Sequence, residues 1–461
     1  MPPTEDSPRH SSNVSRNWLL GLSVLTLAAL SSMIVYNSSA IDLVVDPNAI
    51  TDLDAELGLE TDAEPVVTAS TESLLAQGRA AFRHNRLGSH TWFSRTLKLH
   101  HAIQTLPPAT ALAVGLKVDS DALPASVITD IQQGNVDLND PAVTQVLISL
   151  RAVVGVNGKF SDSGELFEVG ITCALCHSTV DDSIAPGIGR RLDGWANRDL
   201  DVGTIVSLAP RLRVLANLLG VDEETARAVL LSWGPGKFDA HINLDGKAFR
   251  PDGGSGAVLI PPAFGLAGVN LATYTGWGSV PYWNAFVGNL EMSGTGTFYD
   301  PRLEDAERFP IAAREGFGNV RDNPDLISRR LAGLHFYQLS IPAPPAPEGS
   351  YDVEAAARGE AIFLGRAQCG TCHVPPLYTD PGYNLHTPEE IGIDGFQAQR
   401  SPTGAYRTTP LKGLWTHTKG GFYHDGRFAT LGDVIDHYDG HFELQLTTSE
   451  KQDLSEFLMS L

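Results

Sequence analysis

All four cysteines of this 461-residue chain lie in two copies of one pattern, Cys-x-x-Cys-His, at 173–177 and 369–373. Two thiols at this spacing can each form a thioether to one vinyl group of the same porphyrin, and the histidine that follows can bind the iron. A zinc ribbon or a redox dithiol would use the cysteines, but neither explains a histidine at the same place in both copies. The pattern therefore predicts two covalently bound c-type haems, with His177 and His373 as the proximal ligands. The predicted attachment residues are Cys173, Cys176, Cys369 and Cys372.

The N-terminus, 1–40, has the features of an export signal. Residues 1–16 are polar and include two arginines, 18–35 is an almost uninterrupted apolar run, and 37–40 supplies the small residues of a cleavage site. A run of about eighteen residues is also just long enough to span a bilayer, so a cleaved signal peptide and a membrane anchor both remain open. Because the positive flank stays in the cytoplasm, we expect the rest of the chain in the periplasm, where bacteria attach haem to Cys-x-x-Cys-His.

The formal net charge of −21 excludes one class of partner. A phosphate backbone needs a basic face, so we expect no nucleic-acid binding. An acidic surface can instead steer a small, basic redox donor, such as a cytochrome c or a cupredoxin, toward a haem edge.

The elements that must carry the two motifs indicate a mostly α fold with two cytochrome c-like haem domains, the first enlarged by long loops. Helical apolar spacing predicts helices over 74–82, 93–106, 352–364 and 449–461. The stretch between His177 and residue 341 is rich in glycine, proline and aromatic residues, which is typical of loops. We expect a flexible acidic linker at 41–72, an N-terminal haem domain at 73–340, a proline-rich connector at 341–350 and a C-terminal cytochrome c domain at 351–461.

Two segments after the second motif carry a resemblance to a known family. They are Tyr-Arg-Thr-Thr-Pro-Leu-Lys-Gly-Leu at 406–414 and Gly-Phe-Tyr-His-Asp-Gly-Arg-Phe-Ala-Thr-Leu at 421–431. With the two haem motifs, they make 75–461 resemble the bacterial di-haem cytochrome c peroxidase superfamily. Its relatives include the tryptophan-modifying methylamine-utilisation di-haem enzymes and the di-haem rubber oxygenases. The resemblance implies that the first haem binds peroxide or dioxygen on an open side, while the second takes and stores electrons. Peroxide cleavage needs two electrons, which a single ferric haem cannot supply.

The distal ligand of the second haem departs from the peroxidase pattern. Where those peroxidases carry a methionine, this chain has Tyr438. Tyr438 matches the tyrosine ligand of the tryptophan-modifying relatives, whereas the adjacent His437 would give a bis-histidine haem, as in the rubber oxygenases. Both remain candidates, and His386 and His441 are weaker alternatives. Either a tyrosinate or a second imidazole lowers the haem potential relative to methionine.

Near the first haem, the resemblance assigns Glu291 as the acid or base of catalysis, because it occupies the register of the peroxidases' glutamate before a methionine. A carboxylate there could take the first proton of hydrogen peroxide and return it to the leaving oxygen. Tyr274 or Trp277 would be an aromatic relay between the haems. Trp283, followed fifteen residues later by Phe298, resembles the distal pocket of the rubber oxygenases. Such an apolar pocket favours dioxygen.

Two further predictions complete the site. Thr408 and Pro410 fit the stretch whose main-chain carbonyls hold a calcium ion between the domains of the peroxidases. His100 and His101 could supply a removable ligand to the first haem, although a solvated pair at a helix end is the simpler interpretation.

We therefore expect a di-haem c-type oxidoreductase, similar to the cytochrome c peroxidases, that reduces hydrogen peroxide, or uses peroxide or dioxygen to oxidise a substrate, at the first haem. Electrons would be relayed through the second haem. Two alternatives remain: a non-catalytic di-haem electron-transfer cytochrome, and a haem dioxygenase related to the rubber oxygenases.

Overall fold

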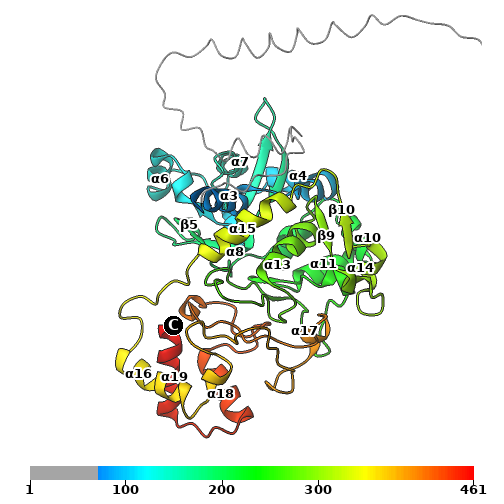
Figure 1. Ribbon diagram of the computed structural model, residues 1–461. Helices are drawn as coiled ribbons and strands as arrows, with labels where there is room; N and C mark the ends of the chain where they lie inside the picture. The colour runs from blue at the N-terminus through cyan, green and yellow to red at the C-terminus, as the bar shows by residue number, and fades with distance from the viewer. Residues whose placement is uncertain (1–70) are drawn as a thin grey trace, which may run out of the picture. The chain divides into compact units, whose positions relative to one another are not determined.

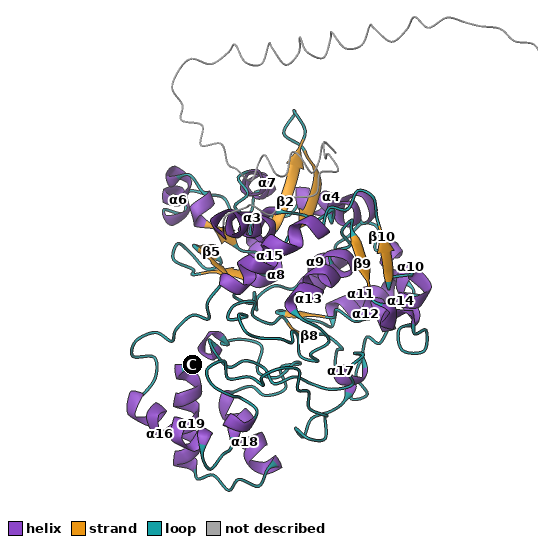
Figure 2. Cartoon of the chain, in the orientation of Figure 1, coloured by secondary structure: helices purple, strands orange, loops and turns teal. Residues whose placement is uncertain are grey.

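The computed structural model describes residues 71–461. The predicted export signal and nearly all of the predicted linker lie outside the described residues. Helices dominate the described chain and the strands form only two-stranded ladders, which confirms the mostly α expectation (Figure 2). No helix in the described range is long and apolar enough to cross a membrane.

The N-terminal part, 71–340, contains many short helices. Its α-helices are α3 (Thr71–His84), α4 (Leu99–Gln104), α5 (Pro108–Ala113), α6 (Ala125–Gln132), α7 (Pro141–Ser149), α8 (Ala174–His177), α9 (Val202–Ser207), α10 (Arg213–Leu219), α11 (Glu223–Leu231), α12 (Ile242–Asp245), α13 (Val280–Phe286), α14 (Pro310–Glu315) and α15 (Ser328–Ser340). Two π-helical turns, η1 (Thr91–Thr96) and η3 (Val287–Glu291), and two 3-10 turns, η2 (Ser120–Ala122) and η4 (Pro301–Glu304), complete the set.

The strands of this part pair in five ladders. One is parallel, β1 (Val118–Asp119) with β5 (Ile188–Gly189). The antiparallel ladders are β2 (Val156–Phe160) with β3 (Leu166–Ile171), β4 (Ser178–Val180) with β6 (Arg191–Asp193), β7 (Lys237–Phe238) with β8 (Val258–Leu259), and β9 (Thr297–Tyr299) with β10 (Asn319–Arg321).

The C-terminal part, 351–461, is smaller. It contains α16 (Val353–Leu364), η5 (Cys369–Thr371), α17 (Phe396–Gln399), η6 (Leu414–Thr416), α18 (Leu431–His441) and α19 (Thr448–Ser460). Helices α16, α18 and α19 lie together beside the C-terminus (Figure 1). Asp352 caps α16 by accepting from the amide of Glu354 at 2.9 Å, and Thr447 with Glu450 forms a capping box on α19. These caps set the helix starts within one residue of the predicted positions.

Two sequence expectations about helices were wrong in detail. The helix expected over 93–106 is interrupted at Lys98, which has a φ of +60° and separates the π-helical turn η1 from α4. The stretch expected to be mostly loop after His177 contains α9 to α15. Most of these helices have six to nine residues, too few for a clear apolar period, and tertiary packing stabilises them. The cluster of Leu212, Leu215, Val229, Leu230 and Trp233 joins α10 and α11 in this way.

Two helix crossings are so close that they require glycine. A Cβ on Gly78 of α3 would lie 1.9 Å from the carbonyl oxygen of Gly333 in α15. A Cβ on Gly359 of α16 would lie 2.0 Å from the carbonyl oxygen of Asp453 in α19. Each crossing packs beside one haem motif, because Cys173 borders the apolar cluster at the α3–α15 crossing and Cys369 borders the one at the α16–α19 crossing.

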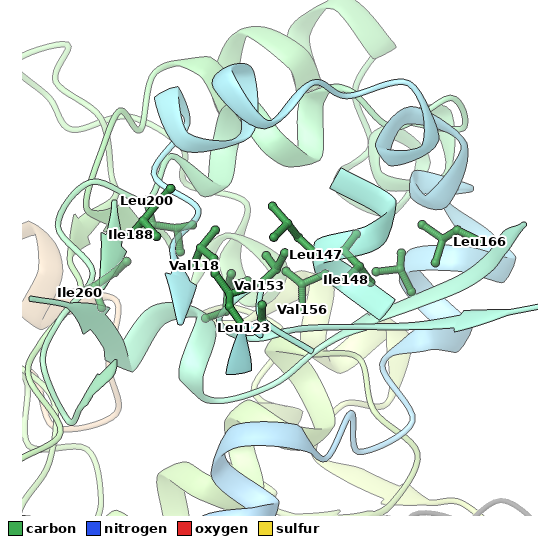
Figure 3. Packing of buried hydrophobic residues seen from close by; sticks show 13 residues of the cluster. Val118, Leu123, Leu147, Ile148, Val153, Val156, Leu166, Ile188, Leu200 and Ile260 are labelled. Carbon is green, nitrogen blue, oxygen red and sulfur yellow. The ribbon is translucent and has the colours of Figure 1, made fainter. Parts of the chain in front are cut away.

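A larger apolar core supports the first motif from another side (Figure 3). It joins Leu147 and Ile148 of α7, strands β2 and β3, and Ile260, and it includes Leu175 from within the motif. Gly155 permits this packing, because a Cβ there would lie 2.1 Å from the amide nitrogen of Leu175. The motif segment is therefore held against buried backbone.

Replacement of Gly359 by alanine tests the second crossing. Gly359→Ala should lower the melting temperature of the holoprotein, because the methyl group collides with the carbonyl of Asp453 and overpacking costs about 1–3 kcal/mol. Gly440→Ala in α18 is the matched control, since nothing lies within 4 Å of its added Cβ, and it should raise the melting temperature through a helix propensity gain of up to about 1 kcal/mol. Equal shifts of the melting temperature in the two variants would contradict the close contact between α16 and α19.

Acid should destabilise the fold through His424. Burial lowers the pKa of this histidine from 6.5 to about 4. Below pH 6.5 the unfolded chain therefore binds a proton that the folded chain does not, and stability falls as the pH falls toward 4. We expect this residue to account for about 2 kcal/mol between pH 7 and pH 5. His424→Gln should lose less stability over this range than the wild type in chemical denaturation, while His101→Gln, at an exposed histidine, should follow the wild type.

Candidate haem sites and the cavity at His177

Both motif histidines are oriented in the same way. Nδ1 of His177 lies 3.1 Å from the carbonyl oxygen of Pro261, and Nδ1 of His373 lies 3.1 Å from the carbonyl oxygen of Tyr378. A carbonyl only accepts, so each ring donates its Nδ1–H and leaves the lone pair on Nε2. Burial lowers the pKa of both rings, which favours the neutral form that binds metal. The two histidines fit the role of proximal haem ligands.

The four thiols fit thioether attachment better than redox or zinc chemistry. None of the four cysteines forms a disulfide. Burial raises the pKa of Cys173 and Cys176 to about 12 and that of Cys369 to about 11, so the thiols stay protonated. A redox dithiol or a zinc ligand needs a stabilised thiolate. A thioether is uncharged and suits these surroundings.

A cavity of about 830 Å³ opens at the first motif. Cys173, Cys176 and His177 line it, as does Pro261, which holds the histidine. This volume is within the range of cofactor and ligand sites, about 300–1,000 Å³. The cavity therefore has the position and the size that the first haem requires.

Glu291 lies in the wall of this cavity. It ends the π-helical turn η3, which follows α13, and such turns are frequent at functional sites. Both carboxylate oxygens are buried, and neither has a hydrogen-bond partner in the described structure. Burial, with a smaller contribution from the charge of Asp239, raises the pKa of Glu291 well above its ordinary value. Burial of the carboxyl therefore favours its protonated form, which is the form that a general acid needs.

The aromatic residues predicted for the first site separate into two sets. Trp283 and Tyr274 line the cavity. Trp277 and Phe298 do not, because both belong to an apolar cluster behind the wall. Phe286 lies between Trp283 and Phe298, with ring centroids 4.6 and 5.8 Å from theirs. Of the predicted pair Trp283 and Phe298, the structure thus brings only Trp283 to the cavity surface.

Tyr274 lies between two buried arginines. Arg198 and Arg407 both act electrostatically on its hydroxyl, although burial dominates and raises the pKa of Tyr274. Arg407 also lines the cavity, donates to the carbonyls of Leu271 and Thr273, and has its pKa lowered to about 10 by burial. No hydrogen bond from Arg407 to a carboxylate is present in the described range. A buried cation of this kind is suited to the carboxylates that a haem carries.

The second site places Tyr438 and His437 differently. Nε2 of His437 lies 3.0 Å from the carbonyl oxygen of Ile391, so only Nδ1 of this ring remains for a metal. Burial raises the pKa of Tyr438, and the thiols of Cys369 and Cys372 add to this shift, which places the phenol beside the attachment residues. Tyr423 is its neighbour, with ring centroids 6.2 Å apart. His386 pairs with Asp380 at 2.6 Å, and Nε2 of His441 faces the carbonyl of Glu390.

The predicted calcium residues lie in a hydrogen-bonded loop. The carbonyl of Thr408 accepts from the hydroxyl of Thr379 at 2.5 Å, and the hydroxyl of Thr408 donates to Asp380. Pro410 follows in the same loop. A cation at this carbonyl would have to share it with Thr379, and calcium remains a prediction.

Sequence reasoning missed several polar residues at the first cavity. Asp239, His241 and Gln397 line it, and Arg400 lies behind it in a buried ion cluster. No motif or spacing marked these residues, because they come from 239–241 and 397–400, two segments that only the fold brings together. The expected His100–His101 pair lies elsewhere: neither residue lines the cavity, and His100 is buried instead of solvated.

The fold and these sites define a class: a mostly helical protein with two Cys-x-x-Cys-His segments, each with its histidine oriented to bind metal. The chain is similar to the methylamine utilization protein MauG of Methylorubrum extorquens, at 26% identity over 237 residues. The alignment covers 44% of this chain and 63% of MauG, so the chain spans less than two thirds of that relative. No family model matches the chain. A solved structure of Kuenenia stuttgartiensis hydrazine synthase pressurised with xenon matches at 22% identity over 32% of this chain and 59% of that chain, with a TM-score of 0.22 that carries no argument.

Replacement of Tyr438 tests the second site. If its phenol faces the iron, Tyr438→Phe should change the absorption and electron paramagnetic resonance spectra of the oxidised second haem and raise its reduction potential, because a hard anionic ligand that stabilises ferric iron is lost. His437→Gln should leave these spectra close to those of the wild type. The opposite pattern would assign the ligand to His437.

Proposed function

We propose that the protein is a di-haem c-type oxidoreductase of the cytochrome c peroxidase type, which reduces hydrogen peroxide at the cavity of His177. The similarity to MauG supports the broad class, as does the resemblance of 75–461 to the di-haem peroxidase superfamily. The single observation that carries the reaction is Glu291, a buried and unpartnered acid in the wall of a cofactor-sized cavity. A non-catalytic electron carrier has no need of such a group.

The residues of the chain would divide the work as follows. His177 and His373 would each bind an iron through Nε2, and the four cysteines would hold the porphyrins. A haem bound at His177 supplies an iron that can bind an oxygen ligand and exchange electrons. Reduction of one hydrogen peroxide to two waters takes up two electrons and two protons. Glu291 would donate a proton to the oxygen that leaves, and general acid catalysis of this kind contributes about 10²–10⁴-fold.

The second site would supply the electrons. The tyrosine candidate Tyr438 would stabilise oxidised iron there, and the acidic chain would attract a small, basic donor such as a cytochrome c or a cupredoxin. We further propose that the chain acts in the periplasm, with or without an N-terminal tether, and that a calcium ion binds near Thr408.

One observation favours a second candidate. Apart from the polar residues already named, the cavity wall is largely apolar and includes Trp283, Leu290 and Met292. Such a wall suits bound dioxygen, so a haem dioxygenase related to the rubber oxygenases is the alternative enzyme. The two activities differ in their need for a proton donor at Glu291.

Peroxide turnover with reduced cytochrome c tests the proposal. Glu291→Gln should lower the rate of peroxide consumption by about 10²–10⁴-fold, because the acid is lost while the shape of the side chain is kept. Glu304→Gln, at an exposed glutamate in the neighbouring turn η4, should match the wild type.

Electron paramagnetic resonance of the oxidised holoprotein separates the remaining classes. A high-spin ferric signal is expected from an open haem at His177. Two low-spin signals would identify an electron carrier, provided that no high-spin signal appears after partial reduction. Full peroxide turnover by Glu291→Gln would remove the acid role, and oxygen-dependent substrate cleavage without peroxide turnover would identify the dioxygenase.

A further inference from the structure

A second polar group in the cavity at His177 is left without a partner. His241 lines the cavity and is only 4% exposed. Its Nε2 atom is buried and has no hydrogen-bond partner in the described structure. A buried ring nitrogen that remains unsatisfied in a cavity wall costs free energy unless something in the cavity uses it.

The ring of His241 is held on its other side. Nδ1 lies 2.7 Å from the side-chain amide of Gln397, and the ring stacks on Trp277 with centroids 5.4 Å apart and planes 28° apart. The amide of Gln397 serves a base at Nε2 when it is turned so that its carbonyl, which otherwise has no partner, accepts from Nδ1–H, because the lone pair of the neutral ring is then on Nε2. Gln397 therefore keeps the ring in place while Nε2 gains or loses a proton.

A buried ion cluster lies next to this histidine. Arg400, 1% exposed, pairs with Asp239 at 3.0 Å and with Asp245 at 2.8 Å. Asp239 also accepts from the backbone amide of His241 at 3.0 Å. Gln397 lies in the short helix α17 of the C-terminal part and Arg400 is the C-cap of that helix, so two side chains from one turn hold both His241 and Asp239.

We propose that His241 is a second acid–base residue of the first cavity, and that Gln397 and Arg400 are the positioning residues that hold it and Asp239. This assignment rests on the proposed function and deepens it. His241 accepts at Nε2 the proton that a small protic ligand, such as hydrogen peroxide, releases when its anion binds in the cavity. Glu291 delivers one proton to the departing oxygen, and His241 returns to the remaining oxygen the proton that it took from the peroxide. One further proton from solvent completes the second water and another reprotonates Glu291, which together are the two protons that the reduction takes up with its two electrons.

The charge states of the two residues agree with this division. Burial, reinforced by the charge of Arg400, lowers the pKa of His241 well below its ordinary value, so the ring is neutral and can accept a proton. Glu291 is shifted in the opposite direction and begins as the acid. Two titratable groups whose pKa values are pushed apart in one site are the arrangement that separates a base from an acid. Arg400 is the charge that acts on His241, Asp239 and Asp245 pair with Arg400, and Glu291 is a titratable group of the same cavity wall.

Cyanide binding to the oxidised holoprotein tests His241 without turnover. Hydrogen cyanide is neutral at pH 7 and binds ferric haem as an anion, so a base in the cavity accelerates its association. In stopped-flow absorbance, His241→Gln should slow this association at least about tenfold, and Gln397→Leu should slow it in the same direction because the ring is no longer held. Gln399→Ala, an exposed glutamine of the same helix, is the matched control and should leave the rate unchanged.

A second variant separates positioning from a structural effect. Gln397→Glu places a carboxylate, which only accepts, against Nδ1 and should raise the pKa of His241. The acid-side fall of the association rate should then begin at a higher pH in Gln397→Glu than in the wild type. An unchanged pH profile in Gln397→Glu with an intact haem spectrum would overturn the positioning role.

The outcomes also distinguish this inference from the proposed function. Normal cyanide association in His241→Gln, together with lost peroxide turnover in Glu291→Gln, would remove His241 and leave the peroxidase proposal standing. Slow cyanide association in His241→Gln, together with normal peroxide turnover in Glu291→Gln, would support the base and overturn the acid role of Glu291.

Discussion

The close approach of two helix pairs is the constraint on which both motif segments depend. Gly78 in the first pair and Gly359 in the second leave no room for a side chain, so the helix backbones are almost in contact. This closeness brings the large side chains around each crossing onto a motif. Phe82 and Leu334 pack with Ala174 in the first, and Phe363 and Phe457 pack beside Cys369 in the second. A bulkier residue at either glycine would separate the helices and loosen the segment that must hold two thiols and a histidine in register with one porphyrin.

The two motif segments, each packed beside a helix crossing, have different surroundings. At the first motif, the surrounding chain forms a cavity of about 830 Å³ with two unpartnered titratable groups in its wall. At the second, Tyr438 and Tyr423 lie against the attachment residues, and the nearby histidines are occupied by backbone or carboxylate contacts. The difference arises from what lies opposite each histidine and not from the contact at Nδ1, which is 3.1 Å in both motifs.

Sequence reasoning reached the features that are local. The motif spacing identified the thiols and histidines, and apolar periodicity located α16 and α19 to within a residue. It also selected Glu291 and Trp283, which the structure brings to the cavity. It could not find His241 or Gln397, because their contact joins residues 156 positions apart. It could not give the protonation state of Glu291, because the pKa of this residue depends on burial and on the charge of Asp239, and neither is visible in the local sequence.

The C-terminal part completes the wall of the cavity at His177. Gln397 and Arg407 line the cavity, and Arg400 neutralises Asp239 behind it. Burial raises the pKa of Asp239 to about 6 despite the attraction of Arg400, so the charge of this cluster is poised near neutral pH. A buried ion cluster of this kind adds little stability compared with well-packed apolar residues, but removing one partner would leave an uncompensated charge beside the cavity. The loop that contains α17 therefore sets the electrostatic surroundings of Glu291 and His241. Because the same part of the chain carries His373, the residues that would supply electrons and those that would organise proton transfer belong to one structural unit.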